Sequence, residues 1–469
     1  MRFLLIGLGA SAAASATILA REGHLVVAGD DRHDERAHDA PLRDAGVAVE
    51  LGPDADRWSA LVESADVVVP SPGVAPSHVA VAAAKSAGKP LWGDVELAGQ
   101  RAAERGLPIV AITGTNGKTT VTALVADMLR AGGHRVEPAG NIGLPALVAL
   151  ERDPTALVLE VSSFQLASTE RFRPDVGVWL NFAPDHLDWH HDLHDYAAAK
   201  ARLWANQTDD DLVVIPAADD VIDSLVVGAR SRIERFDASG TGAGSGTGVA
   251  AASWFVTDGE LCGPSGPMCA VADLPRALPH DLSNSLAAAA AAHALGVEPA
   301  VIAGVLREAA PGRHRVELVA TIDGVAFVDD SKATNPHAAA AAARGFPTVV
   351  LIAGGRNKGL TLDSMVVPSV RAVVAIGESA DEVERAFSAV PVTRASTMSQ
   401  AVAQAAALAN VGDTVLLAPG CASFDWYSGY AERGDDFVRA VGELAPTQQA
   451  PSREPATQQA PSRESASHG

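Results

Sequence analysis

Cysteine and aromatic residues are scarce in this chain of 469 residues. The three cysteines, Cys262, Cys269 and Cys421, are too few and too scattered for a disulfide framework. No second cysteine pair or histidine cluster accompanies Cys262 and Cys269, which argues against a zinc site. Aromatic residues make up 4% of the chain and hydrophobic residues 48%, so we expect cores filled by alanine and aliphatic side chains rather than by rings.

Positively charged residues are fewer than negatively charged ones, and long apolar runs are missing from the sequence. The chain has 36 lysines and arginines against 57 aspartates and glutamates, a net charge of −21, so nucleic-acid binding is not expected. No window of about 18 uninterrupted apolar residues indicates a membrane span. The apolar residues 3–20 contain Gly7 and Gly9, which favour a strand, a turn and a helix over a secretion signal. We therefore expect a cytoplasmic protein.

Short apolar runs alternate with alanine-rich helical stretches along most of the chain. Residues 3–6, 109–112, 157–161 and 349–353 are runs with the length of buried strands. Such alternation indicates βαβ units with largely parallel sheets. We predict an α/β protein of three domains: a Rossmann-like N-terminal domain, a central P-loop ATPase-like domain and a Rossmann-like C-terminal domain.

Breaks in this alternation give the predicted domain limits. Charged helix residues precede a new strand at 98–106, and Pro311-Gly312 interrupts the pattern again. The predicted domains are residues 1–103, 104–312 and 313–443. Residues 444–469 include a repeated polar segment that contains proline, so we predict a disordered low-complexity tail.

Residues 112–120, with the sequence I-T-G-T-N-G-K-T-T, carry the strongest chemical signal. They separate an apolar run from a helical pattern, which predicts a strand, a glycine-bearing turn and a helix start. Backbone N–H groups in such a turn hold phosphate, Lys118 reaches the outer phosphates, and Thr119 can place its hydroxyl on Mg2+. Ile112 stands where the general P-loop pattern has its first glycine, leaving the shorter form G-T-N-G-K-T. The sequence predicts a nucleoside triphosphate site.

Acidic residues and histidines follow two later strands. Glu160 closes an apolar run, at a place where a nucleotide site needs a Mg2+ ligand. Residues 181–191 contain three histidines, which could suggest zinc, but a carboxylate-rich nucleotide site favours magnesium with one histidine. Lys200 follows in an alanine-rich stretch, where a lysine is ordinarily a surface residue.

The first turn, G-L-G-A-S-A at residues 7–12, resembles a dinucleotide-binding turn. Ala12 replaces the third glycine, and Asp30 lies about 20 residues further on. The turn supports a Rossmann-like domain that faces phosphate or sugar groups. A dehydrogenase is an alternative that rests on this turn alone.

Together these motifs resemble those of the Mur ligases, the ATP-dependent amide ligases of peptidoglycan precursor synthesis. The motifs that match occur in the family's order, at residues 114–119, 140–145, 160–165, 181–188 and 196–200. Three later motifs narrow the resemblance to the members that add D-glutamate, at residues 329–336, 354–358 and 418–425. The first turn and the S-P-G-V run at 71–74 agree with this, so the resemblance covers about residues 3–440.

The resemblance implies an ATP site with two Mg2+ ions. The residues implied to bind ATP are Gly114, Thr115, Asn116, Gly117, Lys118, Thr119, Thr120, Asn284, Arg315 and Asp330. Thr119 and Glu160 would share one Mg2+, while His186 and Lys200 would serve the second, with Lys200 as a carbamate formed with CO2. The residues implied to be catalytic are Lys118, His186, Lys200 and Lys332.

The resemblance also implies two small-molecule substrates, no nucleic-acid or membrane partner, and a monomer. Contacts to UDP-N-acetylmuramoyl-L-alanine are implied for Ser11, Asp30, Asp31, Arg32, Ser71, Gly73, Asn141, Ser162 and Gln165. Contacts to D-glutamate are implied for Thr334, Lys358, Ser423, Phe424 and Tyr430. ATP would phosphorylate the carboxylate, and the amine of D-glutamate would attack the resulting acyl phosphate.

Two positions depart from the family's pattern. Asp281 stands where asparagine is usual in the run 280–284, so it is assigned no role. Tyr430 carries a hydroxyl where a ring without one is usual, and ring stacking should survive this change.

Two further alternatives for the function stay open. One is a different ATP-dependent amino-acid ligase, such as folylpolyglutamate synthetase or a neighbouring Mur ligase. The other is a non-catalytic nucleotide switch, which would need neither Lys200 nor a second metal.

Overall fold

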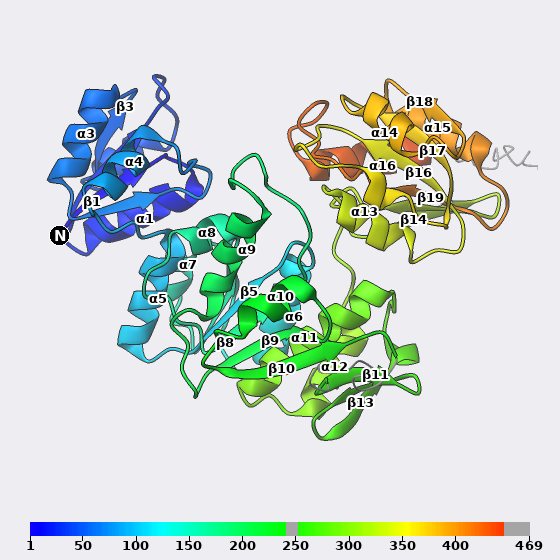
Figure 1. Cartoon of the computed structure of the whole chain (residues 1–469), viewed down its shortest axis with the longest axis horizontal. Helices are drawn as coiled ribbons and strands as arrows, with labels where there is room; N and C mark the ends of the chain where they lie inside the picture. Colours follow the sequence, from blue (N-terminus) through cyan, green and yellow to red (C-terminus); the bar gives the residue numbers. More distant parts are fainter. Residues whose placement is uncertain (241–251, 445–469) are drawn as a thin grey trace, which may run out of the picture.

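The computed structural model describes residues 1–240 and 252–444, and it folds into three α/β domains (Figure 1). The predicted three-domain α/β architecture is confirmed, with one sheet at the centre of each domain. The predicted tail lies, from residue 445 on, outside the described residues. Within the described ranges no helix combines the length and apolar content needed to cross a membrane.

The first domain is a parallel four-stranded sheet in the order β3-β2-β1-β4, covered by helices. Its strands are β1 (Arg2–Ile6), β2 (Leu25–Asp30), β3 (Ala48–Leu51) and β4 (Val67–Pro70), and its helices are α1 (Ala10–Arg21), α2 (Asp39–Asp44), α3 (Ala55–Ser64) and α4 (Val79–Ser86). Alternate residues of β1 enter opposite layers: Leu4 and Ile6 pack with Trp58 of α3, whereas Phe3 and Leu5 pack with the residues of α1.

The middle domain contains a nine-stranded sheet, ordered β13-β12-β11-β10-β9-β8-β5-β7-β6. Its strands are β5 (Ile109–Thr113), β6 (Pro138–Gly140), β7 (Leu157–Glu160), β8 (Val176–Trp179), β9 (Leu212–Pro216), β10 (Arg232–Asp237), β11 (Trp254–Thr257), β12 (Glu260–Gly263) and β13 (Gly266–Ala270). Pairing is parallel from β6 through β11 and antiparallel in β11-β12-β13. The carboxyl ends of β5, β7 and β8 therefore meet at one edge, where the phosphate turn and the acidic motifs begin.

Helices cover both faces of this sheet. They are α5 (Asp94–Arg105), α6 (Lys118–Ala131), α7 (Ala146–Leu150), α8 (Ser163–Ala167), α9 (Leu193–Ala201), α10 (Asp220–Val226), α11 (Pro279–Ala294) and α12 (Pro299–Glu308), with short 3-10 turns at Arg202–Trp204 and Val271–Asp273. Six consecutive alanines of α11, residues 287–292, are buried against α6 and the sheet. Their small side chains let the helix lie close to its neighbours, as the scarcity of aromatic residues predicted.

The predicted boundary at residue 103 falls inside α5. This helix packs on α7 and α8, and the Glu96 carboxylate accepts N–H hydrogen bonds from Glu170, Arg171 and Phe172 at 2.8–3.0 Å. Because α5 also contacts α1, and Arg101 Nε donates to Glu22 Oε1 at 2.9 Å, the helix lies between the first and the middle domains.

The third domain is a six-stranded sheet in the order β14-β15-β19-β16-β17-β18, antiparallel only at β14-β15. Its strands are β14 (Glu317–Ile322), β15 (Val325–Asp329), β16 (Val349–Gly354), β17 (Val370–Ile376), β18 (Val392–Arg394) and β19 (Thr414–Leu417). Its helices are α13 (Pro336–Ala343), α14 (Ala380–Ala386), α15 (Met398–Leu408) and α16 (Tyr430–Leu444), with a 3-10 turn at Asp363–Met365. The loops after β15 and β16 carry the predicted residues Lys332, Thr334 and Lys358.

Candidate active site

The predicted strand, glycine turn and helix are present at residues 109–131. β5 ends at Thr113 and α6 begins at Lys118. Gly117 has a φ of 85°, and a Cβ there would lie 2.6 Å from Asn284 Oδ1, so the turn requires glycine at this position. Asn116 N donates to Asn181 Oδ1 at 2.9 Å, which fixes the turn against the loop after β8.

Lys118 folds back onto its own turn. Its Nζ donates to the carbonyl oxygens of Gly114, at 2.8 Å, and Thr115, at 3.0 Å. Burial lowers the pKa of Lys118, although the charges of Glu160 and Asp185 oppose the shift. A bound phosphate would offer this ammonium group a stronger, charged acceptor than two carbonyls.

A cavity of about 330 Å³ lies between the middle and third domains and brings most of the predicted residues together. The predicted residues that line it are Thr115, Asn116, Gly117, Lys118, Thr119, Thr120, Asn141, Glu160, His186, Asn284, Arg315, Asp330, Lys332, Thr334 and Lys358. They come from the turn after β5 and the start of α6, the ends of β6 and β7, the loop after β8, the start of α11, the segment before β14, and the loops after β15 and β16.

Glu160 is a buried carboxylate with a hydrogen bond to only one of its two oxygens in the described part of the chain. Its side chain is 2% exposed, and Oε1 accepts a hydrogen bond from Asn141 Nδ2 at 2.8 Å. Oε2 is buried and has no hydrogen-bond partner in the part of the chain that the structure describes. A buried, unpaired carboxylate oxygen is costly on its own and suits a divalent cation, so Glu160 fits a Mg2+ site.

His186 is the one of the three clustered histidines that lines the cavity. Its φ of 56° places it in the left-handed region, and burial lowers its pKa to about 4, so the imidazole is neutral near pH 7. The ring nitrogens of His190 are already occupied by Asp195, at 3.1 Å, and Ser163, at 2.9 Å. Because His191 is exposed on the surface, the three histidines do not converge.

Lys200 is not the surface lysine that its alanine-rich context would ordinarily mean. It is 1% exposed, and its Nζ donates to Gly114 O at 2.9 Å and to Thr113 Oγ1 at 3.2 Å. Burial lowers its pKa well below the ordinary lysine value, and the nearby charge of Lys118 lowers it further. An amine whose charged form is disfavoured therefore lies directly beneath the phosphate turn.

Lys332 and Asp330 enter the cavity from the third domain. Burial, together with the charge of Arg315, lowers the pKa of Lys332 to about 8. The Lys332 ammonium lies 4.1 Å from the centre of the Tyr430 ring, so Tyr430 contacts a lysine rather than the cavity. Burial raises the pKa of Asp330 to about 7, an effect that Arg315 partly offsets.

Direct contacts across the cavity join the middle and third domains. Lys358 Nζ lies 3.1 Å from Asp185 Oδ1, and Asn335 Nδ2 donates to Asp185 Oδ2 at 3.1 Å and to Asn116 Oδ1 at 2.9 Å. Sequence reasoning left Asp185 and Asn335 without a role. Each lies next to a predicted residue, but nothing in the sequence shows that the two meet.

The remaining residues predicted for D-glutamate lie outside the cavity lining. Ser423 is buried, whereas Phe424 is 62% exposed. Both follow β19, on the loop that leads to α16. Their predicted role therefore has less geometric support than that of Thr334 and Lys358.

Most residues predicted for the UDP-substrate surround the first turn. Asp30 Oδ2 accepts from Leu8 N at 2.7 Å, and Ser71 Oγ donates to Gly7 O at 2.9 Å, so both brace that turn. The guanidinium of Arg32 is committed to Asp39, at 2.8 Å. Asp31, Gly73 and Ser11 lie in the same domain, outside the cavity between the other two.

A buried aspartate joins the two parts of this predicted substrate surface. Asp94 accepts from Gln165 Nε2 at 3.2 Å and from Ser11 Oγ at 3.3 Å, and burial raises its pKa. Ser162 caps α8 and shares a capping box with Gln165. Asp94 belongs to no recognisable sequence motif. Its position between the first and the middle domains is evident only from the fold.

A glycine-lysine turn at a helix N-terminus, with acidic residues at the ends of neighbouring parallel strands, defines a P-loop-type nucleotide-binding protein with three α/β domains. Residues 1–93 match the MurD-like N-terminal domain of Mur ligases, residues 112–292 the Mur ligase middle domain, and residues 314–421 the Mur ligase glutamate ligase domain. The chain belongs to the Mur ligase family, whose members are ATP-dependent, amide-forming ligases.

Curated relatives and solved structures agree with this assignment. The UDP-N-acetylmuramoylalanine--D-glutamate ligase of Frankia casuarinae is 46% identical over 455 residues, 93% of each chain. The protein of the same name from Desulfosudis oleivorans is 40% identical and covers 94% of this chain and 96% of its own. The crystal structure of MurF from Acinetobacter baumannii shares the fold, with a TM-score of 0.58 at 18% identity over 93% of this chain and 90% of that one.

Proposed function

We propose that this protein joins D-glutamate to UDP-N-acetylmuramoyl-L-alanine, using ATP, in peptidoglycan precursor synthesis. The observation that supports this most is the composition of the cavity between the middle and third domains. It combines a phosphate turn with Lys332 and Lys358, two cations placed opposite that turn. A nucleotide switch needs no such facing set of carboxylate-binding cations.

The proposed reaction has two steps. A carboxylate oxygen of the UDP-substrate attacks the γ-phosphorus of ATP, ADP leaves, and an acyl phosphate forms. The amine of D-glutamate then attacks the acyl carbon, loses a proton, and expels inorganic phosphate to leave the amide. Lys118 and Lys332 would neutralise the charge on the transferred phosphoryl group, while the surrounding turn holds it in line.

We propose that two Mg2+ ions serve this chemistry, one held by Thr119 and Glu160 and the other by His186 and a carbamate on Lys200. The ions would neutralise phosphate charge. The unpaired Glu160 Oε2, the neutral His186 ring and the lowered pKa of Lys200 support this set. An uncharged amine can react with CO2, and the carbamate that forms carries oxygen ligands.

For the amino acid, we propose that one carboxylate of D-glutamate takes the place of Asp185 beside Lys358. Thr334 also lines the cavity and would add a hydroxyl donor. The Ser423 hydroxyl is the candidate for the other carboxylate, and Phe424 and Tyr430 would complete the pocket. This would need the loop after β19 and the start of α16 to approach the cavity. We further propose that the protein works as a monomer in the cytoplasm.

A panel of amino acids tests this function. With ATP, Mg2+ and UDP-N-acetylmuramoyl-L-alanine present, phosphate release should depend on D-glutamate and be at least about 10²-fold slower with L-glutamate, L-alanine or a diamino acid, because those acids cannot fill both carboxylate positions in the same geometry. Equal rates with another amino acid would favour a neighbouring Mur ligase. Turnover on a folate substrate instead would favour the folylpolyglutamate alternative.

A further inference from the structure

The segment that links the middle and third domains contains two strained residues. It runs from the end of α12 at Glu308 to the start of β14 at Glu317. His314 and Val316 have φ values of 57° and 50°, in the left-handed region that residues other than glycine avoid. Val316 is β-branched, so its conformation persists only where the surroundings impose it. Arg315, which lines the proposed nucleotide cavity, lies between them.

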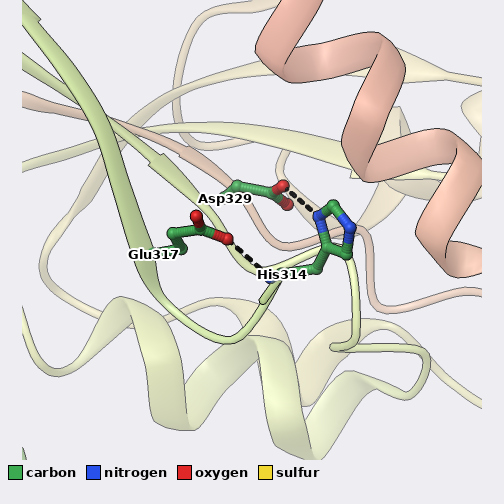
Figure 2. Close-up of side chains that lie close together, drawn as sticks. All are labelled: His314, Glu317 and Asp329. Atoms are coloured by element: carbon green, nitrogen blue, oxygen red, sulfur yellow. Dashed lines mark hydrogen bonds and ion pairs between the residues drawn. The ribbon is translucent and has the colours of Figure 1, made fainter. Parts of the chain in front are cut away.

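The third domain holds one side of this linker. His314 Nδ1 and the Asp329 carboxylate are 2.7 Å apart, and His314 N donates to Glu317 at 2.9 Å (Figure 2). Gly434 makes this contact possible, because a Cβ there would lie 2.2 Å from the His314 ring. The cluster of His314, Glu317 and Asp329 could geometrically hold a metal, but Asp329 is already bonded to the His314 ring and Glu317 to the His314 N–H. It acts as an anchor for the linker.

The middle domain contacts the other side of the linker through one arginine side chain. Arg276, just before α11, donates through one Nη to the carbonyl oxygens of Arg315, at 2.6 Å, and Val316, at 2.9 Å. Its Nε and other Nη donate to the two oxygens of Asp281, both at 2.7 Å. Four of its five N–H groups are thus used, two on Asp281 and two on the linker.

This arrangement gives a role to Asp281, the residue that departs from the family's asparagine. A carboxylate can accept both branches of the guanidinium fork, whereas the amide of asparagine offers one oxygen only. Asp281 Oδ2 also accepts from Leu278 N at 3.2 Å, which fixes it at the start of α11. The orientation of Arg276, and with it the grip on the linker carbonyls, depends on that pair.

We propose that Arg276 and Asp281 form a linker lock that positions Arg315 and Asp330 for the nucleotide. Asp330 belongs to the same device, because its Oδ1 accepts from Val316 N at 3.3 Å. Arg276 and Asp281 also line the cavity. Because their hydrogen bonds go to each other, to Leu278 N and to the linker carbonyls, we treat them as positioning residues that act on the nucleotide through the backbone of residues 315–316. The inference rests on the proposed function only in taking the cavity as a nucleotide site.

Direct binding of a non-hydrolysable ATP analogue with Mg2+ tests the lock. Asp281→Asn should weaken the analogue at least about 10-fold, although it installs the residue usual in the family, and Arg276→Lys should do the same because lysine lacks the fork. KM for ATP should rise in ligase assays while KM for the UDP-substrate stays unchanged. Asp273→Asn is the matched control. It removes one partner of the exposed Arg307–Asp273 ion pair, and this variant should bind the analogue as the wild type does.

A double variant that exchanges the two residues, Arg276→Asp with Asp281→Arg, tells whether the linker contacts matter or only an ion pair at the start of α11. It restores the opposite charges but leaves the two linker carbonyls without a donor, so we expect no recovery of binding. Recovery to the wild-type Kd, or wild-type binding by Asp281→Asn, would overturn the inference. The inference would also be overturned if the variants lost affinity equally for all three substrates and had a lowered Tm, because that result would mean general destabilisation. If the wild-type protein fails to bind the analogue, the proposed function fails instead.

Discussion

Replacing Lys200 with alanine should lower kcat by about 10³-fold or more, and formate or acetate at high concentration should restore part of the activity. The side chain is buried beneath the phosphate turn, and its lowered pKa favours the uncharged amine, the form that reacts with CO2. Alanine removes both the amine and the carbamate that it would form. A small carboxylate can enter the space that is left and supply the missing oxygen ligands. Initial rates measured across a series of formate concentrations check this.

Two comparisons make the Lys200 result specific. Lys85→Ala removes an exposed lysine and should neither lose activity nor respond to formate. Wild-type activity should fall when CO2 is depleted and return when bicarbonate is added. An alanine variant with full activity, or a wild-type enzyme indifferent to CO2, contradicts the carbamate. Rescue by chloride as effective as rescue by formate would show that charge alone is missing.

Glu160→Gln should also lower kcat about 10³-fold, with no loss of stability in the absence of ligands. Glutamine keeps the size and the contact with Asn141 but cannot neutralise a cation. The wild-type carboxylate has a buried oxygen without a partner, which is a cost to the unliganded fold. Removing that charge should therefore leave the unliganded Tm unchanged or raise it.

The stabilisation that Mg2+ and nucleotide confer on the wild-type protein should largely disappear in Glu160→Gln, because ligands stabilise only in proportion to their affinity. Thermal unfolding with and without Mg2+-nucleotide measures this. Glu63→Gln, at an exposed position, is the control and should behave as wild type does. If Glu160→Gln lowers the unliganded Tm and keeps the ligand-induced rise, Glu160 is structural and the assignment as a metal ligand is wrong.

The elements that sequence patterns predicted well are those fixed by local rules. The turn at residues 114–117 requires glycine and precedes a helix, and the apolar runs became buried parallel strands as their length indicated. Lys200 was different, because its position in an alanine-rich helix indicates a surface residue. Its amine is buried because it reaches Thr113 and Gly114 at the end of β5, and these contacts are distant in sequence.

The contacts between domains could not be predicted for the same reason. Asp185 and Lys358 are 173 positions apart, and Asp94 and Gln165 are 71 apart, so no local period links them. Asp281 shows a further limit. It departs from the family pattern, but its pairing with Arg276 is visible only in the folded structure.

The central claim is that the phosphate turn serves to activate a carboxylate, and oxygen-isotope transfer tests this most directly. UDP-N-acetylmuramoyl-L-alanine labelled with 18O in its terminal carboxylate is incubated with ATP, Mg2+ and D-glutamate, and the released phosphate is examined by mass spectrometry. An acyl-phosphate intermediate predicts one 18O atom in each phosphate, because the carboxylate oxygen leaves with the phosphoryl group. Amide product accompanied by unlabelled phosphate would contradict the account.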